Sequence, residues 1–179
     1  MSMLGSEKLN EAIPASNDIS EVLMRLNKGI KVSLRQSDDD ESTRDGMDIA
    51  LCSIDPENKM VRFGGANRPF WLIRNTADEV EEIKVTRAAI GGLTADDRHF
   101  DQHEMKLQKG DTFYLCSDGY ADQFNEQDKK LTSGRFKNIL LEIQNKSMDD
   151  QEEYLRTFIE SWIGNTEQID DILVVGIRL

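Results

Sequence analysis

The sequence predicts an α+β fold in which antiparallel strands are flanked by helices. Over residues 1–36 the apolar side chains recur at helical spacing, whereas from Asp45 onward they alternate with a period of two. The links between the predicted strands are short hairpin turns. Such links leave no room for the crossover helices that parallel strands require, so we expect an antiparallel sheet.

The composition is that of a single globular domain of 179 residues. Hydrophobic residues make up 38% of the chain, enough for one core, and the formal net charge is −12. An acidic surface disfavours nucleic acid and anionic membranes as partners. No apolar run approaches the roughly 18 residues of a membrane span, and no signal-peptide pattern opens the chain. Cys52 and Cys116 lie in apolar stretches, which favours reduced thiols over a disulfide and predicts a cytoplasmic protein.

Two helices are expected in the first third of the chain. The first runs from Met1 to about Ala12, and Pro14 prevents it from continuing. The second begins after an N-cap at Asn17 or Asp18, buries one apolar face and ends near Gln36. The clustered acids of Ser37–Ser42 then predict a solvated loop.

From Asp45 the alternation predicts short strands at 47–54, 59–64, 70–74, 82–85, 105–107, 112–116 and 172–177, with two helices, 133–144 and 148–164, before the last strand. Asp55–Asn58 is expected to be a hairpin turn. The strand 112–116 is almost entirely apolar, which is typical of a central strand. We therefore expect one domain, with residues 1–36 helical and residues 45–179 forming a strand meander, a helix pair and a final strand.

Acidic residues flank the two most apolar of these strands. Asp118-Gly119 follows directly on the first of them, and Asp170-Asp171 directly precedes the final strand. Carboxylates at the ends of neighbouring strands meet at one edge of a sheet, and hard cations such as Mg²⁺ and Mn²⁺ prefer oxygen ligands. The pattern therefore indicates a metal site. The alternative is that these acids only cap turns, because Ser-Asp-Gly is an ordinary turn sequence.

Four segments, in the same order along the chain, carry a family resemblance. They are Phe63–Phe70, Lys109–Asp111, Leu115–Gln123 and Ile169–Val175. The third resembles the Ser-Asp-Gly motif of the metal-dependent (PPM-type, type 2C) serine/threonine phosphatases, and the fourth resembles their closing Asp-Asp/Asn motif. The first two resemble the Ala-Gly-Asn/His-x-Pro segment and the turn before Ser-Asp-Gly that are typical of the bacterial SpoIIE branch of that family.

The resemblance implies a layered β-sandwich of two antiparallel sheets flanked by helices. It implies that Asp118 and Asp170 are metal ligands, with Asp171 as a further candidate. In the family, two Mn²⁺ or Mg²⁺ ions activate a water molecule that attacks phosphorus directly, so we expect no side chain of this chain to be the catalytic group. The candidates for the border of the site are Gly119, Gly65 and Asn67.

The family's first metal motif, an acidic Gly-rich loop that opens a helix, is not found in this sequence. Asp45-Gly46 does not substitute for it, because that pair leads into a predicted strand. We therefore expect the chain to correspond to the C-terminal three-quarters of a phosphatase domain, and to be inactive or weakly active. The alternative is a non-catalytic phosphatase-like module that binds a partner protein or a second copy of itself.

The resemblance also suggests partners. It implies a substrate phosphorylated on serine or threonine, a regulatory protein in bacterial signalling. Sheets that lack their first strands would expose unpaired edges, so we expect a homodimer. His99 and His103, four residues apart, are weak candidates for zinc ligands, and the glycine pairs lack the neighbours that nucleotide binding requires.

Overall fold

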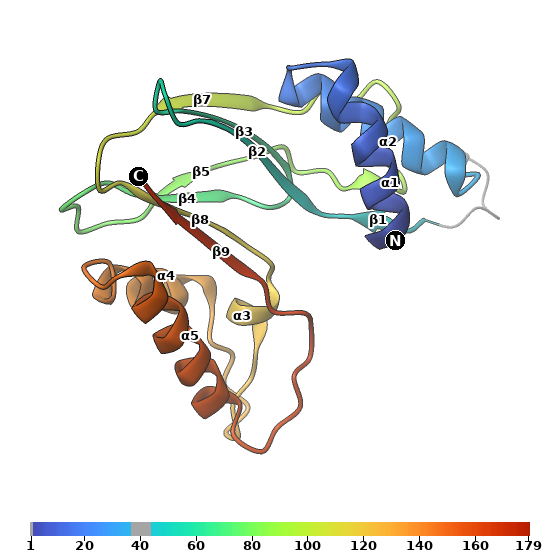
Figure 1. The fold of residues 1–179 in the computed structure, drawn as a ribbon. Coiled ribbons are helices and arrows are strands. Elements are labelled where there is room, and N and C mark those ends of the chain that lie inside the picture. The colour runs from blue at the N-terminus through green and yellow to red at the C-terminus, as the bar shows by residue number, and fades with distance from the viewer. Residues whose placement is uncertain (1, 37–43) are drawn as a thin grey trace. The chain divides into compact units, whose positions relative to one another are not determined.

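The computed structural model describes residues 2–36 and 44–179, and Figure 1 shows the course of the chain through them. The expected acidic loop Ser37–Ser42 lies outside the described residues. The helices are α1 (Ser2–Ala12), the short 3-10 turn η1 (Ile13–Ala15), α2 (Ile19–Ser33), α3 (Gly119–Asp122), α4 (Ser133–Glu142) and α5 (Met148–Ile163). The strands are β1 (Gly46–Met47), β2 (Ile49–Asp55), β3 (Met60–Ala66), β4 (Phe70–Ile73), β5 (Glu81–Ile83), β6 (Ile90–Gly91), β7 (Gln102–Lys106), β8 (Thr112–Cys116) and β9 (Val174–Arg178).

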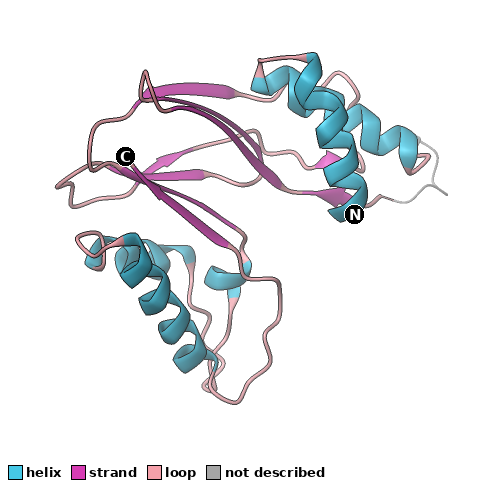
Figure 2. Ribbon diagram, viewed as in Figure 1, coloured by secondary structure: helices cyan, strands magenta, loops and turns pink. Residues whose placement is uncertain are grey.

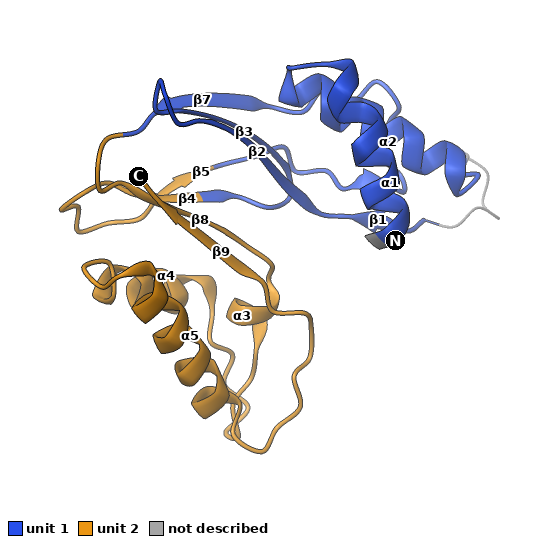
Figure 3. Ribbon diagram, viewed as in Figure 1, with its two compact units in different colours: residues 1–70, 84–107 blue, residues 71–83, 108–179 orange. Residues whose placement is uncertain are grey.

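The chain folds into two compact units, coloured separately in Figure 3. The first unit contains residues 1–70 and 84–107, and the second contains residues 71–83 and 108–179. The expectation of one domain stays a prediction, and each unit is described by itself. In the described part of the chain, no helix is both long enough and apolar enough to cross a membrane.

The first unit combines α1 and α2 with a three-stranded antiparallel sheet of order β2-β3-β7 and with the short pair β1-β6. Asp55 pairs with Met60 across the β2-β3 hairpin, so the expected hairpin is present; its turn covers residues 56–59, one position later than expected, because Asp55 is still paired in β2. Helix α2 begins as expected, because the Asp18 carboxylate accepts a hydrogen bond of 2.8 Å from the backbone N–H of Glu21. Its apolar face joins a buried cluster composed of Ile19, Leu23, Leu26, Ile30, Ala66, Ile90 and Phe100.

The predicted strand 47–54 is in fact two strands. Met47 ends β1, which pairs with β6, whereas Ile49 begins β2, which pairs with β3. The break falls at Asp48, whose carboxylate accepts a hydrogen bond of 2.8 Å from Asn67 and forms an ion pair of 3.0 Å with Arg68. These bonds hold Asp48 against the residues that follow β3. The alternation of apolar and polar residues runs on through Asp48, so the sequence does not show that the strand pairing changes there.

The second unit is a four-stranded sheet of order β5-β4-β8-β9 with the three helices α3, α4 and α5 (Figure 2). Strand β8 lies between β4 and β9 and is antiparallel to both, which confirms its predicted central place. Strand β9 begins at Val174, two residues later than the apolar run suggests, and it lies at the edge of the sheet. The helices and the sheet share a buried hydrophobic cluster, which includes Trp71, Tyr114, Tyr120, Phe136, Leu140, Leu155 and Ile159. The predicted α+β class with antiparallel sheets is confirmed.

The turn before β8 is organised by a buried carboxylate. Asp111 is 2% exposed, and its carboxylate accepts hydrogen bonds of 2.8 Å from the Asn75 N–H and 2.9 Å from the Gln108 N–H. It also pairs with the Arg74 guanidinium at 2.9 Å. Burial opposes ionisation of Asp111, but these hydrogen bonds and the Arg74 charge outweigh it, so the pKa of the Asp111 carboxyl lies below its ordinary value.

Asp111→Asn should therefore destabilise the protein at neutral pH. A lowered folded-state pKa means that the ionised carboxylate contributes stability above about pH 4, and that this contribution is lost as the pH falls further. We expect a loss of about 1–3 kcal/mol at pH 7 and a smaller difference at pH 3, measured by urea unfolding. Asp97→Asn, at an exposed position, is the control; an equal loss at both pH values for Asp111→Asn would contradict the account.

Candidate metal centre

The pairing of β8 with β9 brings the two acidic segments of the second unit to one end of its sheet. Cys116, the last residue of β8, pairs with Val174, the first residue of β9. Asp118 follows the one by two residues, and Asp170 precedes the other by four. The strands are neighbours, as the sequence argument for a metal site requires.

Ser117 fastens these two segments together. Its backbone N–H donates to the Leu173 carbonyl at 2.9 Å, and its hydroxyl donates to the Asp171 carbonyl at 2.8 Å. The same hydroxyl accepts a hydrogen bond of 2.9 Å from the Leu173 N–H. Three hydrogen bonds thus continue the β8-β9 pairing beyond the last ladder position and fix Asp118 beside the chain that carries Asp170 and Asp171.

Gly119 permits this close approach. A Cβ atom at this position would lie 2.4 Å from the Asp171 carbonyl oxygen and 3.2 Å from the Asp170 carbonyl oxygen. The first distance is far shorter than any van der Waals contact, so only glycine fits. Of the sequence-predicted border residues, Gly119 is the one that the structure brings against the acidic pair.

The carboxylates themselves differ in environment. Asp118 is half-buried at the N-cap of α3, and its carbonyl accepts a hydrogen bond of 2.8 Å from the Asp122 N–H. Asp170 and Asp171 are exposed, and one Asp170 carboxylate oxygen accepts a hydrogen bond of 2.7 Å from the Asp171 N–H. Each of the three therefore lies at the surface end of the sheet, where a hydrated cation has access.

Gln123 is a buried residue of this site that the sequence argument missed. Its side-chain amide donates to the Glu167 carbonyl at 2.9 Å and accepts from the Ile169 N–H at 3.2 Å. Its own carbonyl accepts a hydrogen bond of 3.1 Å from the Trp162 indole N–H. Gln123 thus ties the turn after Asp118 to the loop that leads into Asp170. These contacts span about forty residues of sequence, and no local pattern indicates them.

The donor chemistry fits a hard divalent cation, because carboxylate oxygens from Asp118 and Asp170 stand on two segments that are fastened together. Within residues 2–36 and 44–179, however, no three His, Cys, Asp or Glu side chains form a cluster suited to a metal ion.

The other candidates lie in the first unit. A Cβ atom on Gly65 would lie 2.6 Å from the Arg68 carbonyl oxygen, and Asn67 has a positive φ of 60°. Both residues thus shape the tight turn after β3. His99 lies in a loop with its ring 3.2 Å from the Ser20 hydroxyl, and His103 lies in β7, so the two do not share a helix face.

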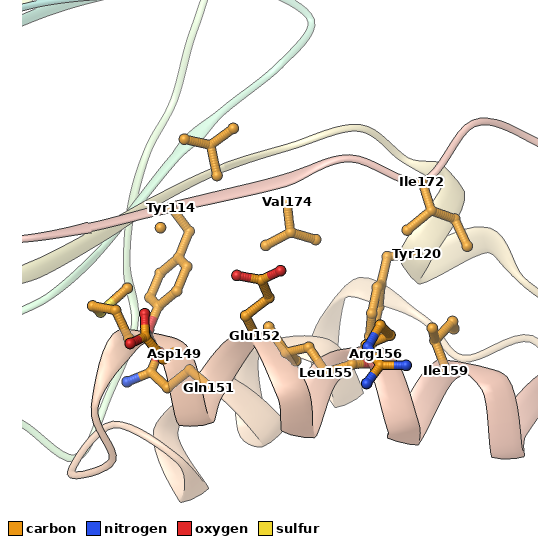
Figure 4. Close-up of a pocket in the computed structure, with 13 residues that line it drawn as sticks. Tyr114, Tyr120, Asp149, Gln151, Glu152, Leu155, Arg156, Ile159, Ile172 and Val174 are labelled. Atoms are coloured by element: carbon orange, nitrogen blue, oxygen red, sulfur yellow. Dashed lines mark hydrogen bonds between the residues drawn. The ribbon is translucent and has the colours of Figure 1, made fainter.

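A pocket of about 490 Å³ lies between α5 and the strands β8 and β9, and it does not include the acidic pair. Figure 4 shows its apolar wall, formed by Leu155, Ile159, Ile172 and Val174, and the charged side chains of Glu152 and Arg156. At one end the Tyr114 hydroxyl donates to the Gln151 side chain at 2.6 Å. Burial raises the pKa of Tyr114 to about 12, so the phenol stays neutral and the pocket offers no acid–base group from this residue.

Comparison with known proteins identifies one family. A family model described as stage II sporulation protein E (SpoIIE) matches residues 1–179. Among solved structures, the SiaA-PP2C domain of Pseudomonas aeruginosa superposes with a TM-score of 0.84 at 28% identity, over 99% of this chain and 68% of that one. The PP2C phosphatase domain of SpoIIE from Bacillus subtilis, with a fragment of its regulatory domain, has a TM-score of 0.70 at 20% identity, over 98% of this chain and 48% of that one.

Two further solved structures share the fold. A manganese-presoaked SpoIIE phosphatase domain of Bacillus subtilis has a TM-score of 0.62 at 16% identity, over 98% of this chain and 73% of that one. RsbX in complex with magnesium has a TM-score of 0.58 at 15% identity, over 96% of this chain and 71% of that one. No curated protein sequence matches the chain.

Gly119→Ala should displace the segment that carries Asp170 and Asp171, because the new methyl group would overlap the Asp171 carbonyl. Overpacking of this kind costs about 1–3 kcal/mol, which chemical denaturation measures. Gly134→Ala, in helix α4, is the matched control, since its Cβ would meet no atom within 4 Å. Equal stability of the two variants would show that the close approach is not required.

Proposed function

Because the chain belongs to the SpoIIE family of PP2C-type phosphatase domains, we propose that it acts in the metal-dependent removal of phosphoryl groups from serine or threonine of a regulatory phosphoprotein. The observation that supports this site is the fastening of Ser117 and Gly119 to the segment 170–173. It places the Ser-Asp-Gly turn beside the closing acidic pair, the two motifs on which the family resemblance rests.

In this proposal Asp118 and Asp170 hold Mn²⁺ or Mg²⁺, with Asp171 as a further ligand. A bound cation would lower the pKa of water and neutralise charge on the phosphoryl oxygens. The chain itself contributes rigid placement: Ser117 fixes the spacing of the two segments, and Gln123 holds the loop before Asp170. The manganese-soaked and magnesium-bound structures of similar domains are consistent with this choice of cation.

The proposed substrate is a phosphorylated protein of a bacterial signalling pathway. The similar domains include a cell-fate determinant and an RsbU domain fused to an RsbW domain. The chain spans 48% of the first of those two proteins and 45% of the second, about half the length of each. The proposed location is the cytoplasm, which the two free cysteines support.

One observation favours the second candidate, a phosphatase-like module that binds a partner without catalysis. A two-ion site needs several ligands close together. Among the described residues, no three His, Cys, Asp or Glu side chains form such a group. We therefore propose that the 179-residue chain by itself turns over slowly even where it binds a cation. The two candidates differ in whether any turnover depends on Asp118.

The test is a Mn²⁺ titration of the chain by calorimetry, together with hydrolysis of p-nitrophenyl phosphate. We expect Mn²⁺ to bind, with at least about tenfold weaker binding in Asp118→Asn and Asp170→Asn, and turnover hardly above the metal-free rate. Asp149→Asn, at an exposed position of helix α5, is the control for the loss of one charge.

Two outcomes would contradict parts of this account. If Mn²⁺ binding is absent, or equal in the three variants, the metal centre is wrong. Robust Mn²⁺-dependent turnover that disappears in Asp118→Asn would support the metal centre and refute slow turnover.

Self-association is proposed for the edge of the second unit's sheet. Strand β9 pairs with β8 on one side and has no strand beyond it in the sheet order of the described residues. Its exposed Val175 and the neighbouring Leu173 are 38% and 59% exposed, so an uncovered edge is also partly apolar. We expect a dimer in light scattering at high micromolar concentration; a mass near 20.4 kDa would contradict it.

A further inference from the structure

A second pocket, in the first unit, is lined by arginines. Arg44, Arg87 and Arg98 surround it, together with the backbone of the loop that follows β6. Its remaining lining residues are uncharged. No acidic side chain is among the residues that line it. In a chain with a net charge of −12, this concentration of positive charge is unusual.

Arg87 and Arg98 are exposed and, unlike several other arginines of the chain, form no ion pair among the described residues. Arg25, Arg74 and Arg156 each form an ion pair with a nearby carboxylate. Among the described residues, no ion pair involves the side chain of Arg87 or Arg98. Their guanidinium groups therefore remain available to an external anion, and guanidinium groups bind phosphate in a bidentate manner.

The loop beneath these arginines is held by polar side chains of helix α2. Asn27 is fully buried; its amide donates to the Ala95 carbonyl at 2.9 Å and accepts from the Gly91 N–H at 2.7 Å. Lys31, 8% exposed, donates to the Thr94 carbonyl at 3.0 Å and pairs with Asp96 at 2.7 Å. Buried polar groups on an amphipathic helix are costly unless they are satisfied. Here they are satisfied by the loop alone, so the loop has a fixed shape.

The glycine pair in this loop has a structural reason. Gly91 and Gly92 have positive φ values of 82° and 60°. A Cβ atom on Gly92 would lie 2.8 Å from the Arg44 carbonyl oxygen. The pair thus allows the backbone around Arg44 to approach the loop closely.

We propose that this pocket binds the phosphoryl group of a phosphorylated protein segment through Arg87 and Arg98. Arg44 contributes to the positive lining. Within the first unit, a hydrogen bond connects the pocket to the turn after β3: the Asn67 N–H donates to the Thr86 carbonyl at 3.1 Å, one residue before Arg87. The phosphoprotein character of the ligand rests on the proposed function; the anion site itself does not.

The test measures binding in metal-free buffer, where the candidate metal centre takes no part. The probe is a short neutral peptide with one phosphoserine, titrated against the ¹⁵N-labelled chain and followed at the amides of Gly91 and Gly92. Inorganic phosphate, the unphosphorylated peptide and a peptide with glutamate in place of phosphoserine are the comparison ligands. The variants are Arg87→Gln/Arg98→Gln and, as a control for net charge, Arg25→Gln/Arg156→Gln.

We expect the phosphopeptide to bind and the Arg87→Gln/Arg98→Gln variant to bind it at least about tenfold more weakly, since two charge-assisted hydrogen-bonding groups are lost. Affinity in the Arg25→Gln/Arg156→Gln control should stay within about twofold, because those arginines do not line the pocket. Unfolding midpoints show whether each variant remains folded.

Other results overturn the proposal. Equal weakening in both double variants would mean general electrostatic attraction. Equal binding of the glutamate peptide, or of inorganic phosphate alone, would refute a site for phosphorylated protein segments. Failure of Mn²⁺ to bind in the earlier titration would leave these measurements unaffected, so the two proposals fail separately.

Discussion

The hydroxyl of Ser117 is the interaction on which the candidate metal centre depends. It donates to the Asp171 carbonyl and accepts from the Leu173 N–H, so one small side chain completes the pairing of two strands after the ladder itself has ended. Without it, the side-chain hydrogen bonds between Ser117 and residues 171 and 173 would be lost, and only the backbone bond from the Ser117 N–H to the Leu173 carbonyl would remain between them. With it, the two backbone segments that carry Asp118 and the Asp170-Asp171 pair are held side by side, which would lower the entropic cost of binding a cation in the proposed metal centre.

The two units divide the chemistry by charge. The second unit carries its carboxylates at the end of a sheet, where short-range backbone hydrogen bonds set their spacing. The first unit carries arginines around a loop whose carbonyl groups accept hydrogen bonds from Asn27 and Lys31 of helix α2. Cations and guanidinium groups each compensate the negative charge of a phosphoryl group.

The elements that the sequence predicts well are those that local patterns determine. The Asp18 cap, the Asp55 hairpin and the limits of β8 each follow from neighbours within a few residues, and all are found. The break at Asp48 is invisible in the alternation, because its cause is an ion pair with a residue twenty positions away. Asn27 and Gln123 escape notice for the same reason: a buried amide reads as an ordinary polar residue until its distant partners are known. The metal-ligand roles proposed for Asp118 and Asp170 rest on the family motif, and the segments that carry the two residues are adjacent as expected.

The hydrogen bond from the Trp162 indole to the Gln123 carbonyl has an optical consequence. The excited-state dipole of an indole senses the polarity and the hydrogen bonding of its surroundings, and Trp162 is half-buried at the junction between α5 and the loop that leads to Asp170. The chain's other tryptophan, Trp71, is almost fully buried, with its indole donating to Glu82. The emission wavelength of Trp162 thus reports on the order of the loop that leads to Asp170, without any attached label.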